Sequence, residues 1–67
     1  MKVKSSIIDE IDYDPAKRSL KVLFHGGNLH VYNDVGASKY QELMTSKSHG
    51  SYLKRQIIPH HHSVKLK

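Results

Sequence analysis

Histidine is the side chain most often used for acid–base chemistry or metal binding near neutral pH, and six of the 67 residues are histidines. Three of them, His60, His61 and His62, are consecutive. Adjacent histidines bind transition metals only weakly, because a structural zinc site needs separated ligands whose rings are held by further partners. We therefore predict no metal site for this segment, and we expect residues 60–67 to form a solvated tail or, alternatively, a short edge strand.

The residue types of a catalytic centre are present but not in a recognisable arrangement. A nucleophile, a base and an orienting partner must converge in a cleft, and a short chain offers little room for one. The sequence contains no cysteine and no glycine-rich phosphate loop. The acidic residues between positions 9 and 14 alternate along a predicted strand and lack the loop and glycine of a calcium site. We expect a noncatalytic protein without a cofactor.

The cations of the C-terminal half are the strongest candidates for ligand binding. Residues 1–34 carry five Lys or Arg and five Asp or Glu, whereas residues 35–67 carry six against one, so the whole net charge of +5 lies in the second half. This asymmetry favours an anionic partner, with nucleic acid first. The cluster consists of Lys47, His49, Lys54 and Arg55. Ser48 and Gly50 would leave backbone N–H groups free at the positive end of a helix, although a solvated helix face is the alternative.

A second candidate surface lies on the predicted sheet. Aromatic rings on an open sheet can stack on unpaired bases while nearby cations hold phosphates. The hairpin described below places His30 and Tyr32 on one face, with Lys21 directly across from Tyr32. Alternatively, Tyr32 packs beneath the second helix as part of the core.

Three strands and two helices are expected to position these residues. Alternating apolar residues predict strands at residues 5–13, 19–25 and 28–34. Apolar residues three and four apart then predict helices near residues 38–46 and 50–58, the first opened by a capping box of Ser38 and Gln41 and the second ended by Pro59.

The turn at Gly26 and Gly27 predicts the register of the hairpin. A two-residue loop pairs Val22 with Val31 and Lys21 with Tyr32. One face of the hairpin is then wholly apolar and the other is mixed. The apolar face holds Val22, Phe24, Leu29 and Val31, and the mixed face holds Lys21, Leu23, His30 and Tyr32.

The whole sequence thus predicts one small α+β domain, a three-stranded antiparallel meander followed by two short α-helices packed on one face. We assign residues 5–58 to this domain and residues 59–67 to a basic, histidine-containing tail. No apolar run approaches the roughly 20 residues that span a bilayer, and no apolar export signal is visible. We expect a cytoplasmic protein without membrane contact.

Several short pieces follow one another along the chain: Ser5-Ser6-x-Ile8, Tyr13-Asp14, Leu20-x-Val22-x-Phe24, Gly26-Gly27, Tyr32-x-x-Val35, Tyr40-x-x-Leu43, Ser48-x-Gly50 and Tyr52. In this order they resemble the KTSC domain family. The family is named for its occurrence at the C-terminus of some lysyl-tRNA synthetases and also occurs as free-standing proteins. Two positions depart from its pattern: a central Tyr-x-Tyr reads His30-x-Tyr32, and Gly36 replaces a proline before the first helix. The resemblance implies no established activity, and its synthetase context suggests RNA binding.

Two functional hypotheses follow. In the first, the protein binds RNA or another single-stranded nucleic acid through the basic second helix, with Tyr32 as a stacking residue. In the second, it is a protein-interaction module that docks through the exposed sheet face, with Leu23 and Tyr32 as contacts. A salt titration separates them, because phosphate contacts make affinity fall steeply with ionic strength. The oligomeric state stays open.

Overall fold

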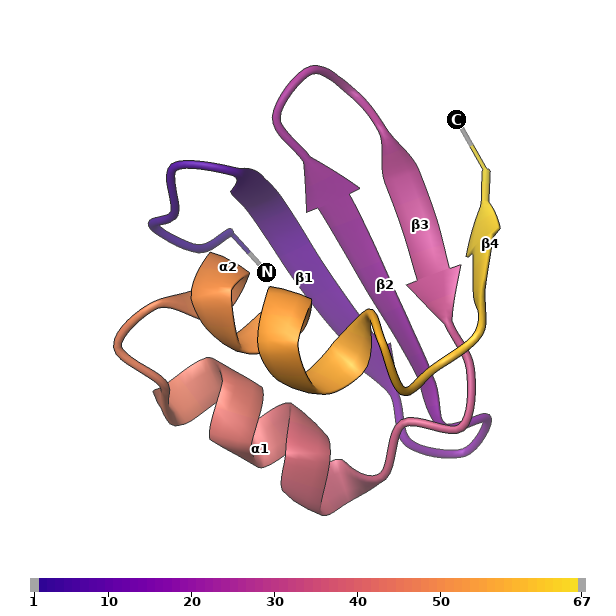
Figure 1. The fold of residues 1–67 in the computed structure, drawn as a ribbon. Helices are drawn as coiled ribbons and strands as arrows, with labels where there is room; N and C mark the ends of the chain where they lie inside the picture. The colour runs from indigo at the N-terminus through magenta and orange to yellow at the C-terminus, as the bar shows by residue number, and fades with distance from the viewer. Residues whose placement is uncertain (1, 67) are drawn as a thin grey trace.

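A four-stranded antiparallel sheet and a layer of helices on one of its faces make up the computed structural model, which describes residues 2–66 (Figure 1). The strands, in sheet order, are β1 (Ile8–Asp14), β2 (Ser19–Phe24), β3 (Leu29–Tyr32) and β4 (Ser63–Lys65). The helices are α1 (Ala37–Thr45), α2 (His49–Tyr52) and a π-helical continuation, η1 (Leu53–Ile57). The predicted α+β class is confirmed, with a fourth strand added to the meander.

The core lies between the sheet and the helices. Leu43, Leu53 and Ile57 enter it from the helical side and are fully buried. From the sheet come Ile8, Ile11, Leu20, Val22 and Tyr32. The predicted helical stripes thus face the sheet, and burying them is what holds the two layers together.

Strand β1 contains an irregularity that the alternating pattern did not predict. The pairing with β2 shifts between Ile8 and Glu10, which leaves Asp9 as an extra residue in β1. Ile8 and Ile11, three positions apart, are therefore both fully buried. The strand begins at Ile8 rather than at residue 5, and the residues before it form a loop.

The hairpin between β2 and β3 has a three-residue loop, and the predicted register is wrong by one position. Phe24 O accepts a hydrogen bond from Gly27 N at 3.1 Å, and Phe24 N donates to Asn28 O at 2.8 Å. Gly26 and Gly27 have φ values of 96° and 90°, which L side chains rarely adopt. The chain thus turns through residues 25–27 instead of through the two glycines alone.

This shift exchanges the two faces of β3, because successive side chains of a strand point in opposite directions. Leu20 pairs with Tyr32 and Val22 with His30, so His30 and Tyr32 lie on the helix-covered side. Leu29 and Val31 join Lys21 and Leu23 on the outer face. The predicted apolar and mixed faces are both incorrect in this strand.

Both helices start at slightly different places from those predicted. The first begins with Gly36 as its N-cap and without a side-chain capping bond, so the capping box of Ser38 and Gln41 does not form. In the second, Ser48 is the N-cap, and its Oγ accepts from Ser51 N at 3.2 Å. At the far end Ile58 N donates to Leu53 O, five residues back, which is the bond of a π-helix.

The C-terminal segment forms the edge strand β4, the alternative to a tail, although most of its side chains are exposed. Asn33 N donates to His62 O at 3.0 Å, and Leu66 N donates to Leu29 O at 2.7 Å. The ring nitrogen Nδ1 of His61 lies 3.1 Å from Asn33 O. These bonds attach residues 61–66 to β3, where Val31 pairs with Val64. Across residues 2–66, no helix has both the length and the apolar character needed to cross a membrane.

Candidate functional site

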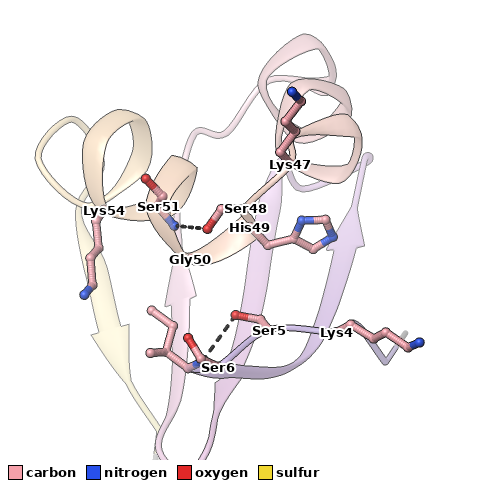
Figure 2. Close-up of a pocket in the computed structure, with 10 residues that line it drawn as sticks. Lys4, Ser5, Ser6, Lys47, Ser48, His49, Gly50, Ser51 and Lys54 are labelled. Carbon is pink, nitrogen blue, oxygen red and sulfur yellow. Dashed lines mark hydrogen bonds between the residues drawn. The ribbon is translucent and has the colours of Figure 1, made fainter.

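A polar cavity of about 400 Å³ lies where the loop before β1 meets the start of α2 (Figure 2). Its lining consists of Lys4, Ser5, Ser6, Ile7, Lys47, Ser48, His49, Gly50, Ser51 and Lys54. We call this the basic pocket. In Figure 2 the serines lie in the middle of the group, and the three lysines extend from different sides of it.

The first wall is the loop of residues 4–7, which is held in place by hydrogen bonds. Ser5 Oγ accepts from Ile7 N and Ile8 N, each at 3.2 Å. The His25 ring nitrogen Nε2 lies 3.0 Å from Ser5 O, and His25 N donates to Ile7 O at 3.0 Å. These bonds hold Ser5 and Ile7 against the start of β1 and against His25 in the turn of the hairpin.

The second wall is the first turn of α2, which packs directly on the first. A Cβ at Gly50 would lie 2.7 Å from both Cδ1 and Cγ1 of Ile7, closer than real Cβ atoms approach. Only glycine allows the two segments to come this close without a shift of Ile7. Where Ile7 and Gly50 touch, no space is left between the two walls, and we call this the closed side of the pocket.

The pocket is electropositive. Lys4, Lys47 and Lys54 contribute three charges, and no carboxylate belongs to its lining. Within residues 2–66, the ammonium groups of these three lysines make no hydrogen bond or ion pair with other protein groups. His49 Nδ1 is buried and has no hydrogen-bond partner in that range either. The three ammonium groups thus give the pocket unpaired donors and a positive potential, the combination that attracts phosphate groups.

A comparison with known protein families shows which family contains this domain. The sequence profile of the KTSC domain family matches residues 4–61, which include every residue of the basic pocket. The chain belongs to the KTSC domain family. Its two pocket walls carry two of the family pieces noted above, the Ser5-Ser6-x-Ile8 and Ser48-x-Gly50 patterns, which are far apart in sequence and adjacent in space.

Two relatives extend the comparison. A protein of Tsukamurella paurometabola is 31% identical over 64 residues, which cover 96% of this chain and 96% of the relative. The crystal structure of a KTSC domain protein from Yersinia pestis has a TM-score of 0.93 and 29% identity, covering 100% of this chain and 94% of the other. This KTSC domain and its relatives are thus alike over nearly their full length.

The KTSC domain brings together three of the four residues predicted to form a phosphate-binding patch at the second helix. Lys47, His49 and Lys54 all line the basic pocket. Arg55 is exposed but lies outside the lining, and its Nε donates to Ser51 O at 3.3 Å. The α-helical turn that bears the pocket is short, so the side-chain charges contribute more to its potential than the helix dipole does.

The predicted stacking surface does not form. Tyr32 is only 3% exposed, and its burial raises the pKa of its phenol above the ordinary value. His30 stacks on Tyr32 with ring centroids 6.3 Å apart and meets Phe24 edge-on at 5.4 Å. Lys21 lies across from Val31 on the outer face of the sheet. The expectation that Tyr32 faces solvent beside Lys21 is wrong because of the register shift, and the core alternative is correct.

Sequence reasoning missed one wall of the pocket entirely. Lys4, Ser5 and Ser6 were not among the predicted site residues, and neither was Ser51. The consecutive serines at 5 and 6, already part of the family pattern, were the available signal. Their distance from Lys47 in the sequence hid the relationship, since only the packing of Ile7 on Gly50 brings the two segments together.

Proposed function

We propose that this KTSC domain is a noncatalytic module that binds RNA or another single-stranded nucleic acid through the basic pocket. The observation that carries the proposal is the convergence of three lysines, one histidine and four serines on a cavity without a carboxylate. Cations and hydroxyls are the groups that most often contact the phosphates and sugars of nucleic acids. The net charge of +5 adds a long-range attraction for the same kind of ligand.

The pocket supports backbone recognition better than base recognition. Its lining contains no Tyr, Phe or Trp, and the aromatic rings of Tyr32 and His30 lie elsewhere. Binding through phosphates carries little sequence information. We therefore expect similar affinity for strands of different sequence.

Fluorescence anisotropy with a labelled single-stranded RNA tests this function. Lys54→Ala should weaken binding to all sequences and lower the slope of log affinity against log salt by about one unit per lost phosphate contact. Lys17→Ala is the matched control, because Lys17 is an exposed lysine of the β1–β2 turn, outside the basic pocket. The proposal fails if the wild-type protein binds no single strand at low salt, or if both variants weaken binding equally.

One observation favours a second candidate, docking of a protein on the outer sheet face. Val64 is 47% exposed and Leu66 is 53% exposed, and the half-buried Leu29 and Val31 belong to the same face. Of the two contact residues expected from the sequence, Leu23 lies on this outer face, whereas Tyr32 lies on the opposite, helix-covered face and would not touch the partner. Binding of such a partner should change little with salt and should be lost in a Val64→Ser, Leu66→Ser variant that keeps its affinity for RNA.

A further inference from the structure

We infer that the basic pocket takes the terminal phosphate of a nucleic-acid strand, a phosphomonoester, in preference to the phosphodiesters along the strand. This inference rests on the proposed function and adds which part of the nucleic acid the pocket recognises. Three features of the pocket carry it: its closed side, its charge and its lack of Tyr, Phe and Trp side chains.

The closed side favours a group that ends a chain. Ile7 and Gly50 pack against each other at the pocket, so a strand cannot continue between the two walls there. A phosphodiester has a sugar on both sides and must lie across an open groove. A terminal phosphate has a sugar on one side only, and its remaining oxygens can enter between the two walls.

The donors are distributed in a way that suits such a group. They come from the loop of residues 4–6, from residues 47–51 at the start of α2, and from Lys54 in η1 (Figure 2). A terminal phosphate presents three strong acceptor oxygens, so it can contact donors on several sides at once. A phosphodiester presents only two unesterified oxygens and leaves more of these donors unpaired.

The charge of the pocket also matches a dianion better than a monoanion. Three lysines line it without a neighbouring carboxylate. A phosphomonoester carries about −1.5 to −2 charges at pH 7, whereas a diester carries one. Hydrogen bonds between charged partners are roughly twice as strong as neutral ones, so the additional charge increases the affinity.

His49 is the single aromatic ring among the lining residues, which makes binding along a strand by base stacking less favourable. Proteins that bind along a strand usually combine cations with several aromatic rings on which successive bases stack. No Tyr, Phe or Trp is present in the lining. An end phosphate supplies its affinity through charge and hydrogen bonds, which are the interactions that these lysines and serines offer.

The test compares one labelled RNA oligonucleotide in three forms: with a 5′-hydroxyl, with a 5′-phosphate and with a 3′-phosphate. We expect at least one phosphorylated form to bind about tenfold or more tightly than the hydroxyl form, and inorganic phosphate to displace it better than chloride at equal ionic strength. Lys4→Ala and Lys54→Ala should remove this preference, and Lys17→Ala should keep it. Circular dichroism spectra of the variants confirm that they are folded.

The outcomes separate the inference from the proposed function. If all three forms bind equally and Lys54→Ala still weakens them, the inference is refuted and nucleic-acid binding stands. If no form binds, both are refuted. A phosphoserine peptide serves as a further probe: if it binds more tightly than every RNA form, the inference is overturned in favour of a phosphorylated protein partner.

Discussion

Gly50 is the residue on which the geometry of the basic pocket depends most. Its missing side chain allows α2 to lie against Ile7, and both pocket walls pass through this contact. Gly50→Ala should lower the free energy of unfolding, because an overlap with Ile7 costs about 1–3 kcal/mol while alanine regains up to about 1 kcal/mol as a helix former. Urea denaturation measures the difference.

The same substitution in an Ile7→Ala background provides the control. Removing Cγ1 and Cδ1 of Ile7 removes the two atoms that the new Cβ would overlap, and the third neighbour, Ser5 Oγ, lies at an ordinary contact distance of 3.5 Å. Gly50→Ala should then be neutral or stabilising by up to about 1 kcal/mol. An equal loss of stability in both backgrounds would contradict the close contact as the reason for glycine here.

Two tyrosines make the stability of the domain sensitive to alkaline pH. Burial raises the pKa of Tyr32. For Tyr52, burial raises the pKa, and so do the hydrogen bond to Glu42 Oε1 at 2.8 Å and the charge of that carboxylate. Because folding favours the neutral phenols, their contribution is fully present below the unfolded pKa of about 10 and is lost as pH rises above it.

We therefore expect the free energy of unfolding to fall as the pH rises above about 10, and to fall less steeply in Tyr52→Phe. That variant loses the hydrogen bond to Glu42 and is less stable at neutral pH, but it has no phenol to ionise at this position. Urea denaturation across the pH range measures both effects. A parallel pH dependence in the two proteins would exclude Tyr52 as a contributor.

At the scale of elements, the hairpin of β2 and β3 decides which side chains reach the core. The three-residue loop places Val31 on the outer face, across from Lys21, whereas Val22 is fully buried. Val31→Glu should change stability by about 1 kcal/mol or less, since a carboxylate facing a lysine across strands is worth about 0.2–1 kcal/mol. Val22→Glu should unfold the domain, because it buries an unpaired charge.

Thermal melts followed by circular dichroism compare the two variants. The comparison is specific to the register, because a two-residue loop would bury Val31 beside Val22 and make both substitutions severe. A loss of folding in Val31→Glu would therefore argue against the three-residue loop.

At the scale of the whole molecule, the fold is expected to be independent of metal ions. Within residues 2–66, no group of three or more His, Cys, Asp or Glu side chains is placed to hold one. EDTA should leave the melting temperature unchanged. A clear decrease would implicate the histidines at positions 60–62, of which His61 already packs against Asn33 O.

The sequence by itself determined the features that depend on neighbouring residues. Alternation in β2, the helical spacing of Leu43, Leu53 and Ile57, and the turn at Gly26 and Gly27 were readable because period and turn chemistry are local properties. The excess of positive charge in the second half is also readable from the sequence, and it predicted Lys47, His49 and Lys54 as binding residues, which all line the basic pocket. The order of these elements was also sufficient for the KTSC resemblance.

Tertiary structure decided the features for which local chemistry allows more than one solution. A pair of glycines fits a loop of two or of three residues, and only the packing of all strands against the helices selects the register that buries Tyr32. The pairing of β4 with β3 follows from the bond between Asn33 and His62, which no pattern in residues 60–67 reveals. The basic pocket likewise joins Lys4 to Lys47 and Lys54 through contacts between distant segments, since the energy of such contacts depends on the folded arrangement and not on sequence spacing.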